Sequence, residues 1–212
     1  MPLLQLRFPL ASRFVTHDTH TRMKLTPEIL ERAYRRGIFP MPGLFGSIDW
    51  YQPDPRGVLP LDAFHASRSL QRTLKKSEFT VSYDRDFTGV MRGCAERKPT
   101  WINETFIENY TALHKMGKAH SVEVWKDGQL AGGTYGVHLG GAFFAESKFH
   151  RVTDASKVAL AKLVERLKER GFALLEVQYL TTHLAQFGVT AIPHDEYLRR
   201  LAAALALNCT FA

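Results

Sequence analysis

The 212-residue sequence has little cysteine and no long hydrophobic run. Its two cysteines, Cys94 and Cys209, lie far apart, so they predict neither a disulfide framework nor a paired-cysteine metal site. The strongest apolar run near the C-terminus, residues 201–207, is too short to cross a bilayer, and no signal-peptide pattern begins the chain. We therefore expect a soluble, cytoplasmic protein without contact to a membrane.

The sequence also lacks a recognisable metal-ligand pattern. Its nine histidines form no pair at helical spacing that a carboxylate could complete as third ligand. His17 and His20 come nearest, and they lie in a polar stretch. We expect no metal site.

Positive charge, in contrast, is in excess. The chain carries 28 Lys and Arg against 21 Asp and Glu, a formal charge of +7, which favours an anionic partner and nucleic acid first. Four cations recur at helical spacing within residues 67–76 and should share one face of a short helix: Arg68, Arg72, Lys75 and Lys76. An ordinary solvated helix face is the alternative reading of such a run.

Proline and glycine divide the chain into two parts. A helix predicted at residues 26–36 is followed, up to residue 60, by a density of these residues that excludes long regular elements. We expect a small loop-rich domain over residues 1–62 and a larger domain over residues 63–212, on a chain long enough for both. We expect a monomer.

The larger part predicts an α+β protein. Alternating segments joined by turn signals, one of them Asp127-Gly128, indicate a strand meander, and a helix, a strand and two further helices follow. This order is typical of the GNAT-like, acetyltransferase-type fold. The expected helices and the strand lie at residues 103–116, 154–170, 172–178, 181–187 and 194–207.

The start of the helix at residues 154–170 argues against an ordinary acetyltransferase. Such enzymes hold the pyrophosphate of CoA on backbone N–H groups of a glycine-containing loop, because glycine permits close approach. The corresponding residues 149–157 contain no glycine, and Asp154, the expected N-cap, would repel a pyrophosphate. We expect no CoA and no other cofactor.

Several short motifs together resemble the leucyl/phenylalanyl-tRNA–protein transferase family over residues 25–201. In that family an amino acid passes from a charged tRNA to the N-terminus of a protein, which is thereby marked for degradation. The resemblance implies aminoacyl-tRNA and acceptor proteins as partners, with leucine or phenylalanine as the donor residue. The matching motifs are at residues 34–40, 50–56, 65–69, 100–102, 119–125, 132–137, 146–147, 155–157 and 192–193.

The resemblance also implies roles for aromatic and basic residues. Trp50, Trp101 and Phe143 match aromatic positions of the pocket for the aminoacyl side chain and terminal adenosine, a task for which large aromatic surfaces are suited. Core packing is the alternative role for these three. The four cations at residues 68–76 match the family's tRNA-contacting stripe, where neutralised phosphates supply affinity.

Three further residues match positions at the reaction centre. Glu146 matches a glutamate that holds the charged N-terminal residue of the acceptor. Glu176 and Gln178 match a catalytic Asp-x-Gln pair, and their spacing along a strand should direct both side chains to one face. The alternatives are that Glu146 pairs with Lys148 or Lys157, and that Glu176 faces solvent.

The sequence departs from the family at the pocket. Glu176 replaces an aspartate, Thr134 a pocket methionine, Lys148 a methionine and His150 a serine. Because Glu146, Lys148 and His150 alternate, we expect them to share one face, with Lys148 neutralising Glu146 or repelling acceptors that begin with Arg or Lys. Two rival functions stay open: an acyltransferase with another donor, and a non-catalytic basic RNA-binding protein.

Overall fold

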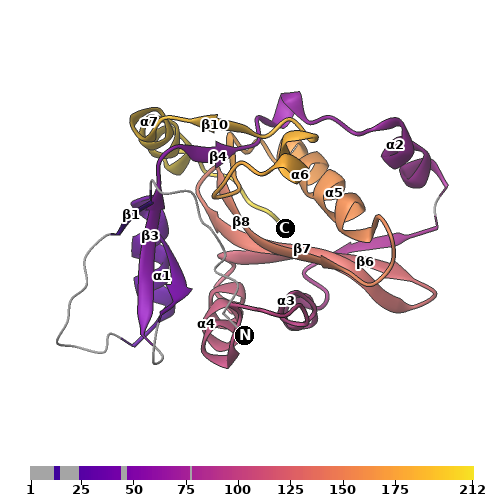
Figure 1. The fold of residues 1–212 in the computed structure, drawn as a ribbon, viewed down its shortest axis with the longest axis horizontal. Helices are drawn as coiled ribbons and strands as arrows, with labels where there is room; N and C mark the ends of the chain where they lie inside the picture. The colour runs from indigo at the N-terminus through magenta and orange to yellow at the C-terminus, as the bar shows by residue number, and fades with distance from the viewer. Residues whose placement is uncertain (1–11, 15–23, 44–46, 77) are drawn as a thin grey trace, which may run out of the picture.

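The computed structural model describes residues 12–14, 24–43, 47–76 and 78–212. Within these residues the strands form two sheets, one with three strands and one with seven (Figure 1). The predicted α+β class is confirmed. No helix in this part of the chain is long and apolar enough to span a bilayer.

The small sheet lies beside the predicted first helix. Its strand order is β1-β3-β2, with both pairs antiparallel, and α1 (Pro27–Arg35) packs against it. Thr26 caps α1 by accepting a hydrogen bond from the N–H of Ile29 at 3.3 Å, so the helix begins where the sequence predicts. The strands are β1 (Ser12–Phe14), β2 (Phe39–Pro42) and β3 (Ile48–Pro53).

The large sheet has the order β10-β4-β9-β8-β7-β6-β5. Strands β6 to β8 form the predicted antiparallel meander, and β5, which precedes α3 and α4 in the chain, pairs antiparallel with β6. Asp127 and Gly128 have the positive φ values, 51° and 76°, of the predicted tight turn. β8 then pairs with β9 in parallel, as a GNAT-like order requires. The strands are β4 (Arg56–Val58), β5 (Thr80–Tyr83), β6 (Ala119–Lys126), β7 (Gln129–Leu139), β8 (Ala142–His150), β9 (Leu174–Glu176) and β10 (Thr190–Ile192).

Helices cover both faces of the large sheet, with α5 on one face and α3 and α4 on the other (Figure 1). Two separate hydrophobic clusters result. Phe144 lies in the cluster on the α3–α4 face, and Phe143 lies in the cluster beneath α5. The helices are α2 (Arg68–Lys75), α3 (Phe87–Ala95), α4 (Glu104–Lys115), α5 (Ala155–Glu169), α6 (Thr182–Ala185) and α7 (His194–Leu205), with a short 3₁₀ turn, η2 (Leu61–Ala63).

Sequence patterns miss α3 and the short strands β4, β5 and β10. α3 contains two glycines, Gly89 and Gly93, which lower its helix propensity, yet tertiary packing requires the second of them. A side chain at Gly93 would begin 2.4 Å from the ring of Phe149. β4 belongs to the seven-stranded sheet although it precedes residue 62, and the domain boundary at that residue stays a prediction.

Two local predictions need correction. Asp154 is the N-cap residue of α5 as expected, but its side chain makes no capping hydrogen bond; it adopts φ 68°, and its carboxylate accepts a hydrogen bond from Lys157 Nζ at 2.7 Å. The strand expected at residues 172–178 covers only Leu174–Glu176, because the chain turns at Gln178, which has φ 60°.

Candidate active site

A buried ion pair joins the strands β4 and β9. Arg56 Nη1 lies 3.1 Å from Glu176 Oε1, and each side chain is only 1% exposed. The guanidinium also donates to the carbonyl of Gly37 and lies 4.3 Å from the ring centre of Tyr197. Arg56 therefore connects the end of α1, the large sheet and α7, and Glu176 does not face solvent.

Gln178 extends this pair to a second glutamate. Its backbone N–H donates to Glu176 Oε1 at 2.6 Å, and its side-chain amide donates to Glu146 Oε1 at 3.2 Å. The two side chains do not alternate along one strand as expected: Gln178 lies beyond β9 in a left-handed turn, its backbone N–H contacts Glu176, and its side chain is directed to Glu146. The four residues form one connected chain: Arg56, Glu176, Gln178 and Glu146.

Glu146 is held by phenols on its other side. Tyr110 Oη donates to Glu146 Oε2 at 3.4 Å and lies 2.5 Å from the hydroxyl of Tyr34. Burial raises the pKa of Glu146 to about 8, which favours its neutral form near neutral pH. The structure contradicts the alternative that Glu146 pairs with Lys148 or Lys157, since its recorded partners are phenols and an amide.

We expect the raised pKa of Glu146 to make stability depend on pH. Between the pKa of the unfolded chain, near 4.5, and the folded value, about 8, the native carboxyl keeps a proton that the unfolded one releases. The free energy of unfolding should therefore fall as pH rises across this window, by up to about 1.4 kcal/mol per pH unit. Urea unfolding of wild type and Glu146→Gln at pH 5, 6.5 and 8 measures it: the difference between the two proteins should change with pH, and parallel curves would contradict the prediction.

A β-bulge sets the direction of the Glu146 side chain. β7 and β8 pair Tyr135 with Ser147 but Gly136 with Ala145. Between these two pairs β8 contains one additional residue, Glu146, which has no partner on β7. The alternation of faces along β8 shifts at this point.

The expectation that Glu146, Lys148 and His150 share a face is consequently wrong. Glu146 points to Tyr110 on the α3–α4 side, whereas Lys148 lies over the ring of Phe187 at 5.6 Å, on the α5 side. Only Lys148 and His150 share a face, and both line one cavity. Lys148 therefore neither neutralises Glu146 nor meets an acceptor held there.

The three predicted pocket aromatics have different surroundings. Trp50 on β3 and Trp101 before α4 are half-buried against the α3–α4 cluster, so each keeps surface for a ligand. Phe143 is only 1% exposed and packs 5.5 Å from the ring of Phe211 under α5. This core position argues against direct contact of Phe143 with a substrate.

Thr134 also lies on the buried side of β7. It is 4% exposed, and its hydroxyl donates to the carbonyl of Ser147 at 3.0 Å. It faces Lys148 across the β7–β8 pair. The hydroxyl thus has an internal partner, and the substrate role of Thr134 stays a prediction.

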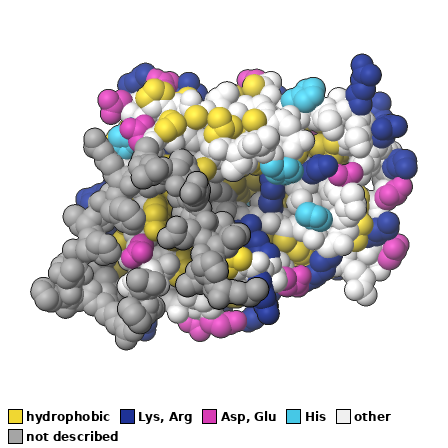
Figure 2. Space-filling view, in the orientation of Figure 1, with side chains coloured by type: hydrophobic (Ala, Val, Ile, Leu, Met, Phe, Trp, Pro, Cys, Tyr) yellow, Lys and Arg dark blue, Asp and Glu magenta, His cyan; other side chains and the backbone are white. Residues whose placement is uncertain are grey.

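The predicted basic stripe is an exposed face of α2. Ser67 caps the helix at the N–H of Leu70, whose buried side chain anchors the opposite face. Its four cations are exposed, and dark-blue side chains gather at the end of the molecule where α2 lies (Figure 2). Lys76 lies 3.5 Å from Glu78, which leaves most of the stripe's charge available.

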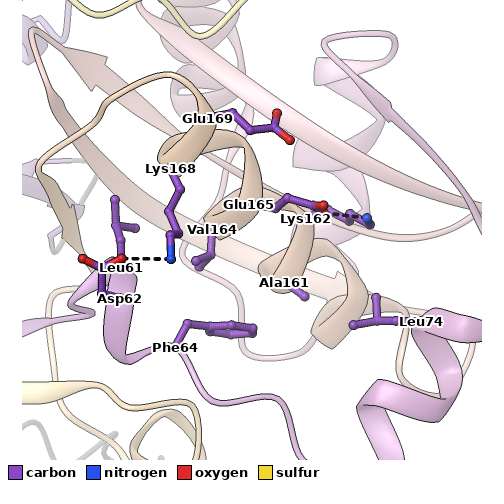
Figure 3. Close-up of a pocket in the computed structure, with 10 residues that line it drawn as sticks. All are labelled: Leu61, Asp62, Phe64, Leu74, Ala161, Lys162, Val164, Glu165, Lys168 and Glu169. Atoms are coloured by element: carbon purple, nitrogen blue, oxygen red, sulfur yellow. Dashed lines mark hydrogen bonds and ion pairs between the residues drawn. The ribbon is translucent and has the colours of Figure 1, made fainter.

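A groove of about 490 Å³ runs along the apolar side of α2, between η2 and α5 (Figure 3). Phe64, Leu74 and Val164 are among its apolar lining residues. Its lysines pair with carboxylates, Lys168 with Asp62 at 2.9 Å and Lys162 with Glu165 at 2.5 Å. The pairing leaves no excess charge for an anion there.

One group among the described residues could hold a metal ion, and sequence patterns did not reveal it. Ligand atoms of Asp84, His114 and His120 lie within 4.8 Å of one another. Internal hydrogen bonds already use them: His120 Nδ1 is 2.7 Å from Asp84 Oδ2, and His114 Nδ1 is 2.9 Å from the carbonyl of Ala119. His17 and His20 lie outside the described residues.

Sequence reasoning also missed Arg56, Tyr34 and Tyr110 as members of the site. Arg56 and Tyr34 lie within two of the family motifs, at residues 50–56 and 34–40, and these motifs could have indicated both residues as members of the site. Tyr110 reads as one apolar position of an amphipathic helix. Its hydroxyl gains a role only when α4 packs against β8.

Comparisons with known proteins identify the family of this chain. The model of the leucyl/phenylalanyl-tRNA protein transferase family matches residues 58–202, and the model of its N-terminal domain matches residues 23–54. The chain belongs to this family. The first match includes Val58 of β4 together with Glu146, Glu176 and Gln178, and Arg56 lies between the two matches.

Curated members of the family are similar over nearly the whole chain. A leucyl/phenylalanyl-tRNA–protein transferase of Rubrobacter xylanophilus is 53% identical over 191 residues, which cover 90% of this chain and 100% of that protein. One of Ruegeria pomeroyi is 54% identical over 196 residues, covering 90% and 91%. Among solved structures, FemX matches with a TM-score of 0.52 at 12% identity, covering 78% of this chain and 66% of FemX, which shows a shared fold.

Proposed function

We propose that this protein transfers an aminoacyl group, leucyl or phenylalanyl, from a charged tRNA to the N-terminal α-amine of acceptor proteins and so marks them for degradation. The observation that carries the proposal is the connected chain of Arg56, Glu176, Gln178 and Glu146, of which the last three lie inside the family match. Both substrates are macromolecules of the cytoplasm, where we place the reaction.

The reaction is the aminolysis of an ester. The amine nitrogen attacks the ester carbonyl, the C–N bond forms, the bond to the ribose oxygen breaks, and the proton of the amine passes to that oxygen. Such a step needs a neutral amine and an aligned carbonyl, so positioning supplies much of the acceleration. We assign to Gln178, whose side-chain amide donates to Glu146, the role of aligning the attacking amine with the ester carbonyl.

Glu176 takes a different role from the one that its match implies. Its side chain is 1% exposed and is occupied by Arg56 and by the N–H of Gln178. We assign it as a positioning residue that fixes the turn of Gln178. Glu146, at the half-buried end of this chain, is the carboxyl available to hold the acceptor terminus.

Binding of charged tRNA should depend on α2 and on salt. Neutralising Arg68, Arg72, Lys75 and Lys76 together to Gln removes four phosphate-binding charges and should reduce the slope of log affinity against log salt by about 3. Filter binding between 50 and 200 mM salt measures the slope. Arg199→Gln with Arg200→Gln, two exposed cations of α7, is the control, and an unchanged slope in the α2 variant would contradict the proposal.

The decisive assay for the function offers labelled aminoacyl-tRNAs and acetyl-CoA in parallel to a panel of peptides. We expect leucyl or phenylalanyl transfer to the α-amine and no acetyl transfer. Acetyl transfer alone would establish the rival acyltransferase. Binding of tRNA without any transfer would establish the RNA-binding protein.

A further inference from the structure

A cavity of about 300 Å³, separate from Glu146, lies between the end of β8, the start of α5 and α6; we call it the α5 cavity. Histidine and cationic side chains gather around α6 on the face shown in Figure 2. The lining of the α5 cavity combines cationic, imidazole and hydroxyl groups with one carboxylate: Arg97, Lys148, His150, Thr153, Asp154, Ser156, Lys157 and His183.

The α5 cavity carries net positive charge. Its single carboxylate, Asp154, is paired with Lys157 at 2.7 Å, so the repulsion of phosphate that the sequence suggests is cancelled. Within the described residues, Arg97 and Lys148 have no ion-pair partner. An anion would supply the counter-charge for these two cations.

Lys148 is a half-buried cation of the cavity. Its ammonium lies 5.6 Å from the ring centre of Phe187, and burial lowers its pKa to about 8. Lys157, His150 and His183 line the same cavity as Lys148. Burial lowers the pKa of His183, and the charges of Lys148, Lys157 and His150 lower it further. A half-buried cation held near other positive groups is stabilised when an anion binds.

The position of the cavity links it to the reaction centre. The pairing of β8 with β9 ends at Phe144 and Glu176, so beyond this point the β8 edge runs free toward α6. Lys148 follows Glu146 by two residues, beyond the bulge and on the opposite face of β8. The inference therefore requires that a substrate held at Glu146 and Gln178 passes around the β8 edge that β9 leaves unpaired and reaches the cavity on the α5 side.

We propose that the α5 cavity binds a phosphodiester group of the single-stranded 3′ end of the donor tRNA, next to the aminoacylated adenosine. The inference rests on the proposed function. Arg97 and Lys148 supply the charge, and the hydroxyls of Thr153 and Ser156 are further donors. The same phosphate chemistry could come from the pyrophosphate of CoA, and the test separates the two sources.

The test compares two small donors: phenylalanyl-adenosine, which has no phosphate, and phenylalanyl-cytidylyl-adenosine, which has one phosphodiester. Wild type should use the dinucleotide with a kcat/KM about tenfold higher or more, the scale of one charged hydrogen-bonded contact. Arg97→Gln combined with Lys148→Met should bring that ratio close to one. Arg92→Gln, an exposed α3 cation paired with Glu104 outside the cavity, is the matched control and should keep the wild-type ratio.

Two kinetic outcomes overturn the inference while leaving the function intact. One is equal use of both donors by wild type. The other is an equal loss with both donors in the double variant, which would indicate a structural role or a role in binding the acceptor. Arg97 is exposed, so Arg97→Gln alone keeps the test valid if the double variant does not fold.

Equilibrium binding of the dinucleotide separates this inference from the proposed function. Binding that weakens in the double variant, without transfer from either donor, would support the cavity and contradict the function. The last measurement tests acetyl-CoA as a ligand. If acetyl-CoA binds in a manner that depends on Arg97 and Lys148, and if its acetyl group is transferred to peptides, the cavity binds the pyrophosphate of CoA and the inference is overturned.

Discussion

Arg56→Met should lower the free energy of unfolding by about 3–5 kcal/mol, because it leaves the Glu176 carboxylate buried without a counter-charge. Both side chains are 1% exposed, so water cannot replace the lost guanidinium. The substitution also removes the hydrogen bond to Gly37 and the contact with the Tyr197 ring. Urea unfolding at neutral pH measures the loss.

Two further variants isolate the cause. Arg56→Met with Glu176→Leu removes both charges and should be more stable than Arg56→Met alone, since no unpaired carboxylate remains. Arg35→Met breaks an exposed pair with Glu31 and should cost less than about 1 kcal/mol. A loss in Arg56→Met no larger than that of Arg35→Met would show that the buried pair does not stabilise the fold.

Gln178→Ala should lower kcat by about tenfold to a thousandfold while leaving the affinity for charged tRNA nearly unchanged. The side-chain amide of Gln178 donates to Glu146. Gln178 is not one of the four cations of α2 to which we assign phosphate binding. Its loss removes alignment at the reacting amine but no phosphate contact. Single-turnover transfer to a peptide and filter binding of tRNA separate the two quantities.

Backbone strain needs its own control, because Gln178 has φ 60° and alanine tolerates this region poorly. Gln178→Asn keeps an amide and a residue that accepts positive φ, but its shorter side chain should not reach Glu146. It should therefore lose turnover like Gln178→Ala, with less loss of stability. Near-normal turnover in both variants would remove Gln178 from the mechanism.

Local sequence patterns predicted the regular parts of this protein. The Thr26 cap, the helical spacing of apolar residues in α4 and α5, and the Asp127-Gly128 turn each depend on neighbours within one or two helical turns. These signals are strong because hydrogen bonding and side-chain period act over short separations. The motifs placed along the same elements were enough to predict the family.

Tertiary structure alone decided how the site is built. The bulge that separates Glu146 from Lys148 arises from the pairing of β7 with β8, and no residue of β8 specifies it by itself. The partner of Glu176 is Arg56, 120 residues away, and a buried arginine leaves no periodic signal. The sequence by itself thus determined the elements and the chemical groups. Which groups face each other, and which are removed from water, depends on strand register and burial, which only the folded chain defines.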